Sequence, residues 1–367
     1  MTIQTEERNC MEGRIGLITL DSPATINALN GVMIDEMQAA LDTWAVDDRI
    51  CLVMLQGNGK RGFCAGADVR QLHDALTGRD DPAMPLRFFS KEYRLDYTLH
   101  RFPKPVIGWA HGVVMGGGLG LLSACRYRLV TPDLMMAMPE ISIGLFPDAG
   151  ASWFLNRLPE GLGLFLGLTG ARLNISDALR LGLADLAVYP QQREALLDTI
   201  LATRWSGEAA TDDNRVYRLI NQLDAPPDPS LPASNLAHHE QTIARLCRDG
   251  DLETVVDRLL SEPGEDEWWQ VCIGTLRSGC PVSAWLVHEQ LLRGRQMGLK
   301  DIFRMELVMA SRCAREPNLA EGIRARLIER DNSPSWSHSH VREVPREHVE
   351  SYFTPAWSAQ DDPLIAL

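Results

Sequence analysis

The chain has 367 residues, of which 45% are hydrophobic and 23% are charged. This composition is ordinary for a globular protein, and the length favours a large core with an appended unit. The formal net charge of −13 argues against nucleic acid or an anionic membrane surface as the main partner, because both repel an acidic protein. It still allows a local basic patch that binds a phosphorylated small molecule.

The N-terminal sequence predicts neither a secretory signal nor a membrane anchor. MTIQTEERNCMEGRIGLITL is polar and acidic before its first apolar run, which is wrong for a signal peptide and suits a transit peptide poorly. No apolar stretch reaches the roughly 20 residues that a membrane span needs. The eight cysteines include no CxxC pair, so neither a zinc site nor a disulfide framework is predicted. We therefore expect a cytoplasmic protein with reduced thiols.

Strands and helices alternate in the first part of the chain. The apolar pattern predicts a buried strand over residues 14–20, a helix over 31–44 and a second strand over 51–57. Two further strands are expected at 105–114 and 126–132. This alternation predicts an α/β fold rather than an all-β one.

The pattern changes after residue 205. Proline, serine and aspartate dominate residues 223–235, which predicts a loop or an insertion. Beyond this segment the apolar residues follow helical periodicity. We therefore expect three regions: an α/β core over residues 1–205, a variable insertion over 206–265 and a C-terminal helical region over 266–367.

Glycine-rich loops follow two of the predicted strands. GNGKRG at 57–62 matches the dinucleotide fingerprint G-x-G-x-x-G, but that fingerprint opens directly into a helix, whereas FCAGAD at 63–68 continues the loop. FCAGAD and HGVVMGGGLG at 111–120 each enter a helix, where unpaired backbone N–H groups can bind an anion. A tight turn explains either loop alone. Together they can form an oxyanion hole, in which two N–H groups stabilise charge on a carbonyl oxygen.

Two carboxylates, Glu140 and Asp148, lie on either side of an apolar run in MPEISIGLFPDAG at 138–150. Solvated surface charges are the ordinary interpretation of such residues. Apolar neighbours, however, desolvate a carboxylate and raise its pKa, which acid–base catalysis near neutral pH requires. From the residues alone both interpretations stay open.

The loops FCAGAD and MGGGLG, followed by MPE, resemble the crotonase (enoyl-CoA hydratase/isomerase) superfamily. The resemblance implies a crotonase-like spiral of ββα units that binds acyl-CoA, with residues 1–205 as its catalytic core. It implies that the N–H groups of Ala67 and Gly117 form the oxyanion hole. It also implies that CoA contacts Asn27, Ala28, Lys60, Arg61 and Ala65. For the two basic residues, solvated surface charge is an equally open interpretation.

A particular family within this superfamily is indicated by further motifs. Hydratases carry a second glutamate in GGGxE, where this chain has Gly120. The segments MPEISIGLFPDAG, GGGLGL, KEY at 91–93, MEL at 305–307 and EGIRARLIERDNSPSW at 321–336 instead resemble 3-hydroxyisobutyryl-CoA hydrolases. This resemblance implies hydrolysis of a short 3-hydroxyacyl-CoA in valine catabolism. It implies that Glu140 and Asp148 are catalytic and that the substrate contacts Glu92, Gly117, Glu140 and Asp148.

Several alternatives stay open for the chemistry. Glu140 would act as nucleophile or as base on a water, and Asp148 would bind the 3-hydroxyl group or orient the water. No metal or other cofactor is expected, because CoA enters as part of the substrate. A hydratase or isomerase, a hydrolase of another acyl-CoA (Trp153 departs from the family pattern) and a non-catalytic acyl-CoA-binding protein remain alternatives. The C-terminal helices could build a homo-oligomer or cover the chain's own core.

Overall fold

The structure is a computed structural model that describes residues 3–223, 225–226, 230–264 and 266–367. It divides into two compact units, each made of several segments of the chain. Unit 1 comprises Met1–Ala67, Leu95–Met136 and Leu173–Ser234, and unit 2 comprises Asp68–Arg94, Ala137–Arg172 and Asn235–Leu367. The three regions expected from the sequence are each one continuous stretch of chain, whereas each unit combines several separate segments. The boundaries of the three regions stay a prediction. Part of the loop predicted at 223–235 lies outside the described residues.

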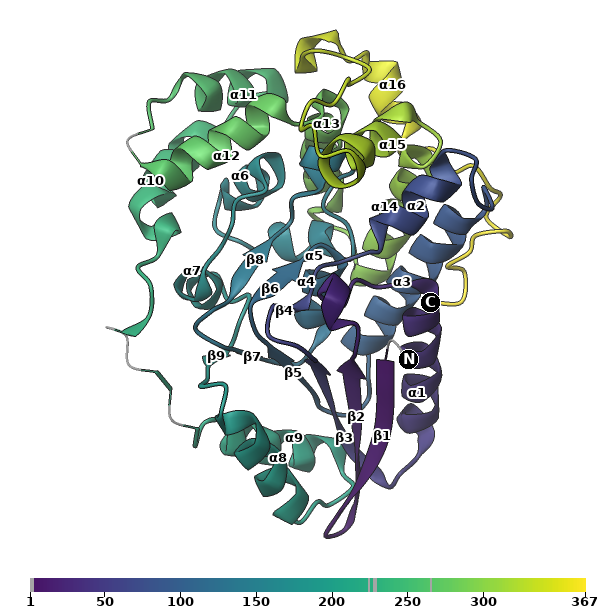
Figure 1. Ribbon diagram of the computed structural model, residues 1–367, viewed down its shortest axis with the longest axis vertical. Helices are drawn as coiled ribbons and strands as arrows, with labels where there is room; N and C mark the ends of the chain where they lie inside the picture. Colours follow the sequence, from purple (N-terminus) through teal and green to yellow (C-terminus); the bar gives the residue numbers. More distant parts are fainter. Residues whose placement is uncertain (1–2, 224, 227–229, 265) are drawn as a thin grey trace. The chain divides into compact units, whose positions relative to one another are not determined.

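Unit 1 is built on a six-stranded sheet with the order β1-β2-β3-β5-β7-β9 (Figure 1). Its first strand pairs antiparallel with the second, and the other neighbours pair parallel. The predicted strands at 14–20, 51–57 and 126–132 are confirmed. The strands are β1 (Ile3–Cys10), β2 (Gly13–Leu20), β3 (Ile50–Gly57), β5 (Val106–Ala110), β7 (Tyr127–Val130) and β9 (Leu186–Ala187).

The strand β1 was not expected from the sequence, because its residues are mostly polar. Ile3 is its one buried residue, and the rest of the strand is exposed or half-buried. An edge strand of this kind is held by the hydrogen-bond ladder to its neighbour rather than by burial of alternate side chains. The sequence pattern therefore carries little sign of it.

A second, three-stranded sheet consists of β4 (Gly62–Cys64), β6 (Val113–Met115) and β8 (Met135–Ala137). Successive strands alternate between the two sheets: β3 precedes β4, β5 precedes β6, and β7 precedes β8. This alternation is the expected spiral. The single strand predicted at 105–114 was wrong, because Gly112, with φ of +52°, turns the chain from the large sheet into the small one.

Helices cover both faces of the large sheet. The helices α8 (Gln192–Ala202) and α9 (Ala209–Ile220) close one face, and α1 (Gly31–Val46), which confirms the predicted helix, places Trp44 against the other. The core beneath α8 and α9 is apolar and draws on four strands. Its buried members include Ile15, Leu17, Leu52, Met54, Ile107, Trp109, Leu129, Leu196, Ile200, Val216 and Ile220.

The regular elements of unit 2 are almost all helices, which confirms the helical C-terminal region. The helix α6 contacts α10, α12 and α13. Among the described residues, no helix is both long and apolar enough to cross a membrane. The elements are α2 (Val69–Leu76), the first part of α3 (Met84–His100), η2 (Glu140–Ile143), α5 (Ala151–Leu155), α6 (Leu162–Thr169), α10 (Asn235–Cys247), α11 (Leu252–Ser261), α12 (Glu267–Ser278), α13 (Pro281–Gly294), α14 (Leu299–Cys313), α15 (Pro317–Ile323) and α16 (Arg346–Ser351).

Candidate active site

Two backbone loops of unit 1 carry the amide groups predicted to form an oxyanion hole. Ala67 ends the loop after β4, and Gly117 is the first residue of α4 (Gly117–Ala124). A Cβ atom at Gly66 would lie 3.3 Å from the Gly117 nitrogen, and one at Gly118 would lie 2.4 Å from the Cys64 carbonyl oxygen. The two loops therefore touch backbone to backbone. The N–H of Gly117 belongs to the first turn of a helix, where the helix itself supplies no acceptor. The function as an oxyanion hole stays a prediction.

The loop after β3 does not have the structure that a dinucleotide site requires. The strand β3 ends at Gly57, and after residues 58–61 the chain enters another strand, β4, rather than a helix. The glycines of GNGKRG therefore do not place a pyrophosphate at a helix N-terminus. The dinucleotide interpretation of GNGKRG is therefore wrong, and the role of FCAGAD stays a prediction.

Asn27 has a structural role that sequence reasoning missed. Its side chain is fully buried. The amide oxygen accepts a hydrogen bond from the Ser22 N–H at 2.8 Å, and Nδ2 donates to the carbonyls of Asn58 and Phe63, each at 3.0 Å. Asn27 thus joins its own turn to the β3–β4 loop. A contact between Asn27 and CoA stays a prediction.

The other residues predicted to contact CoA differ in exposure. Ala28 and Ala65 are half-buried, whereas Lys60 and Arg61 are exposed. The Ala65 N–H donates to the Ile26 carbonyl at 2.9 Å, so these loops are held as one piece. Exposed cations beside such a loop are able to bind a phosphate without reorganising the fold. Their contact with CoA stays a prediction.

Unit 2 gathers the carboxyl groups predicted to be catalytic or to contact substrate. Glu140, at the start of η2, is 5% exposed, Asp148 is 4% exposed, and Glu92 on α3 is 2% exposed. Within the described part of the chain, Oε1 of Glu92 and Oε2 of Glu140 are buried without a hydrogen-bond partner. Such atoms are costly in a folded protein, and a ligand that supplies the missing partner removes the cost. The alternative of solvated surface charges is therefore wrong for Glu140 and Asp148.

Burial raises the pKa of all three carboxyl groups. The pKa of Asp148 is raised to about 6 by burial, against the lowering effect of a hydrogen bond from the Tyr93 hydroxyl. Burial is also the main cause of the raised pKa of Glu140 and Glu92, and the charge of Asp148 is the second cause. Asp148 therefore ionises before the other two and opposes their ionisation. Glu140 is correspondingly a stronger base, once ionised, than a solvated glutamate.

The loop that carries Asp148, residues 144–152, is fastened by side chains that the sequence analysis did not single out. The Glu306 carboxyl group on α14 accepts hydrogen bonds from two backbone N–H groups of the loop, at 2.8 and 2.9 Å. Gln290 on α13 donates to the carbonyl of Pro147 at 3.0 Å. Glu306 belongs to the MEL motif, so the sequence held a signal, but only the structure supplies the physical role.

The segment that carries Glu140 is held by the C-terminal helices. A Cβ atom at Gly322 of α15 would lie 2.3 Å from the carbonyl oxygen of Ile143. The Cys280 N–H, just before α13, donates to the Ile141 carbonyl at 3.0 Å. The glycine of the EGIR sequence thus allows α15 to approach the backbone of η2 closely.

Unit 2 has a cleft of about 880 Å³ that begins at Pro139, the residue before Glu140, and runs along α12. Its lining is mixed, with the polar side chains of Ser142 and Arg326 beside the Trp268 ring. This volume is within the usual range of small-molecule sites. Within the described ranges, no three His, Cys, Asp or Glu side chains are grouped so that they could hold a metal ion.

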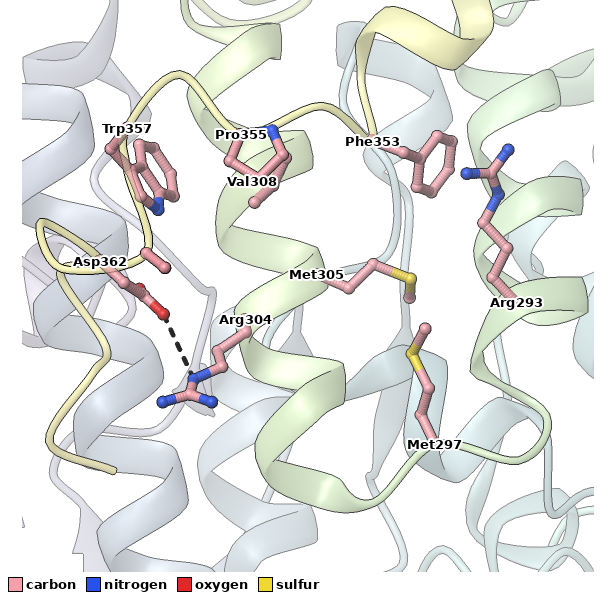
Figure 2. Close-up of a pocket in the computed structure, with 10 residues that line it drawn as sticks. Arg293, Met297, Arg304, Met305, Val308, Phe353, Pro355, Trp357 and Asp362 are labelled. Carbon is pink, nitrogen blue, oxygen red and sulfur yellow. Dashed lines mark ion pairs between the residues drawn. The ribbon is translucent and has the colours of Figure 1, made fainter.

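Another pocket, of about 420 Å³, lies between α13, α14 and the C-terminal segment (Figure 2). Its two arginines are already engaged: Arg304 pairs with Asp362 at 3.3 Å, and the Arg293 guanidinium lies 3.9 Å from the centre of the Phe353 ring. Figure 2 shows Met305 among the apolar side chains that line the rest of the pocket. Because none of the ten residues drawn is among the predicted site residues, this pocket is separate from the carboxyl cluster.

Comparison with known proteins identifies the family of this chain. The model of the enoyl-CoA hydratase/isomerase family matches residues 15–353, and the chain belongs to that family. The chain is also 33% identical to the mitochondrial 3-hydroxyisobutyryl-CoA hydrolase of Gallus gallus, over 94% of this chain and 87% of the relative. The resemblance expected from the sequence is therefore confirmed.

Solved structures confirm the crotonase-like α/β fold. A carnitinyl-CoA dehydratase from Mycobacterium thermoresistibile matches with a TM-score of 0.83 and 30% identity over 96% of each chain. An enoyl-CoA hydratase from Rhodobacter sphaeroides 2.4.1 matches with a TM-score of 0.81 and 32% identity over 96% of this chain and 97% of that one. The relative from Gallus gallus is described as mitochondrial. The cytoplasmic location expected here is not confirmed, and homo-oligomer formation stays a prediction.

Proposed function

We propose that this protein is an acyl-CoA thioester hydrolase that converts 3-hydroxyisobutyryl-CoA to 3-hydroxyisobutyrate and CoA, a step of valine catabolism. The proposal is carried by one observation: Glu140 and Asp148 are both buried, and an oxygen of Glu140 has no partner within the described protein. It is supported by the similarity to a 3-hydroxyisobutyryl-CoA hydrolase over 94% of the chain.

In the proposed reaction the thioester carbonyl oxygen accepts hydrogen bonds from the N–H groups of Ala67 and Gly117, which stabilise its developing charge. Glu140 attacks the carbonyl carbon, CoA leaves as the thiolate, and water opens the resulting anhydride. In the other route Glu140 takes the proton from a water that attacks the carbon directly. Asp148 accepts the hydrogen bond of the 3-hydroxyl group, and Glu92 lines the acyl site. CoA leaves as a product, and no further cofactor takes part.

Hydration or dehydration of an acyl-CoA is the second candidate function. It is favoured by the similarity to two solved structures, one of a hydratase and one of a dehydratase. Against it, Gly120 stands where the resemblance would place the second glutamate of a hydratase. Water addition to a double bond needs one group to deliver a proton and one to position the water.

The first test is release of free CoA thiol from 3-hydroxyisobutyryl-CoA, followed colorimetrically for wild type and Glu140→Gln. The loss expected for the variant is about 10³-fold in kcat, the range of a removed general base or nucleophile. Glu289→Gln is the matched control, because Glu289 is a buried glutamate of unit 2 paired with Arg293 and Arg346. Full activity of Glu140→Gln would remove Glu140 from the mechanism.

Two further measurements separate the alternatives. Loss of the enoyl absorbance of crotonyl-CoA without thiol release would support the hydratase instead. For the two hydrolytic routes, a single turnover in oxygen-18 water is followed by mass spectrometry of the peptide that contains Glu140. Label in Glu140 supports an anhydride that water opens at the glutamyl carbon, whereas label in the released acid alone supports attack of water at the acyl carbon.

A further inference from the structure

Tyr93 is a buried group that the proposed mechanism does not use. It follows Glu92 on α3, and its side chain is fully buried. Its hydroxyl donates a hydrogen bond to Oδ2 of Asp148 with an O···O distance of 2.7 Å. The ring packs on Phe89 and on Phe303, with centroid distances of 5.9 and 6.0 Å. A fully buried phenol packed on two other rings has little freedom, so its hydroxyl defines where the Asp148 carboxyl group can lie.

We propose that Tyr93 is a positioning residue that orients Asp148, so that Oδ2 is held by the phenol and Oδ1 accepts the 3-hydroxyl group of the acyl chain. This inference rests on the proposed function and assigns the preference for 3-hydroxyacyl groups to a pair of residues rather than to Asp148 alone. No bond to Tyr93 forms or breaks.

The groups around Asp148 explain why a hydrogen-bond donor is needed there. The carboxyl groups of Glu92, Glu140 and Glu306 and the thiol of Cys313 face it from α3, η2 and α14, and none of them favours its negative charge. Burial raises the pKa of Asp148 to about 6, and the Tyr93 hydroxyl is the side chain that opposes this. A charge-assisted hydrogen bond from a neutral donor favours the ionised form without adding a second charge.

The ionised state matters because the substrate hydroxyl has to donate. A carboxylate accepts hydrogen bonds at both oxygens, whereas a protonated carboxyl group keeps one oxygen as a donor. A site built to bind a substrate hydroxyl discriminates strongly against an analogue that lacks it, because the buried acceptor is then left unpaired. Loss of the Tyr93 hydroxyl therefore weakens this discrimination even though the ring and the Asp148 side chain remain.

The variant that tests the proposal is Tyr93→Phe, which removes one oxygen atom and keeps the ring. The pH profile to follow is the ratio of kcat/KM for 3-hydroxyisobutyryl-CoA to kcat/KM for isobutyryl-CoA, because this ratio cancels the ionisation of Glu140, which both substrates need. We expect the acid limb of this ratio to move to higher pH, because the pKa of Asp148 rises when the donor is lost. We expect the preference for 3-hydroxyisobutyryl-CoA over isobutyryl-CoA to fall about tenfold, the worth of one hydrogen bond to a charged group. An unchanged acid limb together with an unchanged preference would overturn the proposal.

Tyr352→Phe is the matched control, since Tyr352 is another buried tyrosine of unit 2, and its ring packs on His348 with a centroid distance of 5.5 Å. This variant should keep both the wild-type pH profile and the wild-type preference. A purely structural role of Tyr93 would lower the melting temperature and leave these two readouts unmoved.

A double-mutant cycle shows whether Tyr93 acts through Asp148. If it does, the double variant Asp148→Asn/Tyr93→Phe has the same ratio of kcat/KM for the two substrates as Asp148→Asn alone. Losses of selectivity that multiply in the double variant would overturn the proposal.

Binding of non-hydrolysable thioether analogues separates this inference from the proposed function. The affinities of the 3-hydroxyisobutyl and isobutyl thioethers of CoA are measured by calorimetry for wild type and Tyr93→Phe across pH. A lost preference in the variant supports the inference even if wild type hydrolyses no thioester. A second outcome is that wild type hydrolyses its substrate through Glu140, and wild type and Tyr93→Phe have the same preference between the two analogues. This outcome would leave the proposed function intact and overturn the inference.

Discussion

The two units carry different kinds of chemistry. Unit 1 presents backbone: its candidate groups are N–H groups on loops of small residues, where glycines at 66 and 118 let two segments touch. Unit 2 presents side chains: its candidate groups are the buried carboxyl groups of Glu92, Glu140 and Asp148, with the phenol of Tyr93 beside them.

This difference predicts which kind of substitution each unit tolerates least. A backbone N–H cannot be deleted by exchanging a side chain, so unit 1 is sensitive to added volume. A buried carboxyl group depends on its hydrogen-bond partners and its charge, so unit 2 is sensitive to exchanges that keep the volume and change the chemistry. We expect the largest effects of this contrast on stability in unit 1 and the smallest at the surface charges.

In unit 1, Gly118→Ala should lower the free energy of unfolding by about 3 kcal/mol, the upper range for an overpacked interior. The new Cβ atom would lie 2.4 Å from the backbone oxygen of Cys64, which has no side-chain freedom with which to move away. Chemical denaturation measures the effect. Gly31→Ala is the control, because a Cβ atom there would meet nothing within 4 Å outside its own turn of α1, which begins at this residue. Equal stability of both variants would contradict the contrast.

In unit 2, Asp148→Asn keeps the volume and removes the charge. We expect kcat/KM for 3-hydroxyisobutyryl-CoA to fall about 30-fold, which is about 2 kcal/mol and typical of a lost hydrogen bond to a charged group. The fall for isobutyryl-CoA should be smaller, because that substrate has no hydroxyl to donate. Steady-state kinetics on both substrates measure the difference. Equal falls would show a general catalytic role for Asp148 instead.

Glu306→Gln should destabilise the protein by about 1–2 kcal/mol, because one of the two loop N–H groups loses its acceptor. Burial raises the pKa of Glu306 to about 8. The folded state therefore holds a proton that the unfolded state releases between about pH 4.5 and 8, and this stabilisation is lost as pH rises through that window. The stability difference between wild type and variant should therefore shrink above pH 5 and change sign before pH 8, because the titration removes more stability over this range than the hydrogen bond contributes.

Glu289→Gln is the control for this pH dependence. Hydrogen bonding to His288, followed by the effect of Arg346, lowers the pKa of Glu289 to about 2. Glu289 is therefore ionised in both the folded and the unfolded state above about pH 5.5, so its own titration adds no slope from there to pH 8. Thermal melts across pH give both series. If the stability difference between wild type and Glu306→Gln does not change with pH, the Glu306 carboxyl group is ionised over the whole range.

The smallest effect is expected for the surface charges of unit 1. Lys60→Ala or Arg61→Ala should raise KM about threefold at low salt, and less at high salt, as for an exposed ion pair with a phosphate. Arg204→Ala is the control, since Arg204 is an exposed cation of the same unit that pairs with Glu12. An unchanged KM for CoA thioesters would leave Lys60 and Arg61 as solvated charges.

Much of unit 1 could be predicted because its strands are buried on both faces. Continuous apolar runs such as residues 51–57 have few alternatives in a globular protein, and glycine-rich loops at their ends mark the turns. The strand β1 and the turn at Gly112 escaped prediction for physical reasons. An edge strand depends on a ladder with its neighbour, and a change of sheet depends on one backbone angle.

The candidate site was predictable only as far as the motifs extend. Glu92, Glu140 and Asp148 each belong to a segment that resembles a known family, and the structure shows all three buried in unit 2. Tyr93 and Glu306 were missed. Their hydrogen bonds reach across 55 residues and across more than 150 residues of sequence, and no periodicity spans such separations.

The sequence by itself determined the alternation of strands and helices, the glycine loops and the residues that resemble an acyl-CoA hydrolase, because these depend on local pattern. Only the tertiary structure decided that the acids are buried rather than solvated. It alone decided that Asn27 joins two loops, and that Tyr93 and Glu306 fasten Asp148 and the loop around it. Burial and hydrogen-bond partners arise from segments distant in the chain, so the pKa of a carboxyl group is a property of the fold.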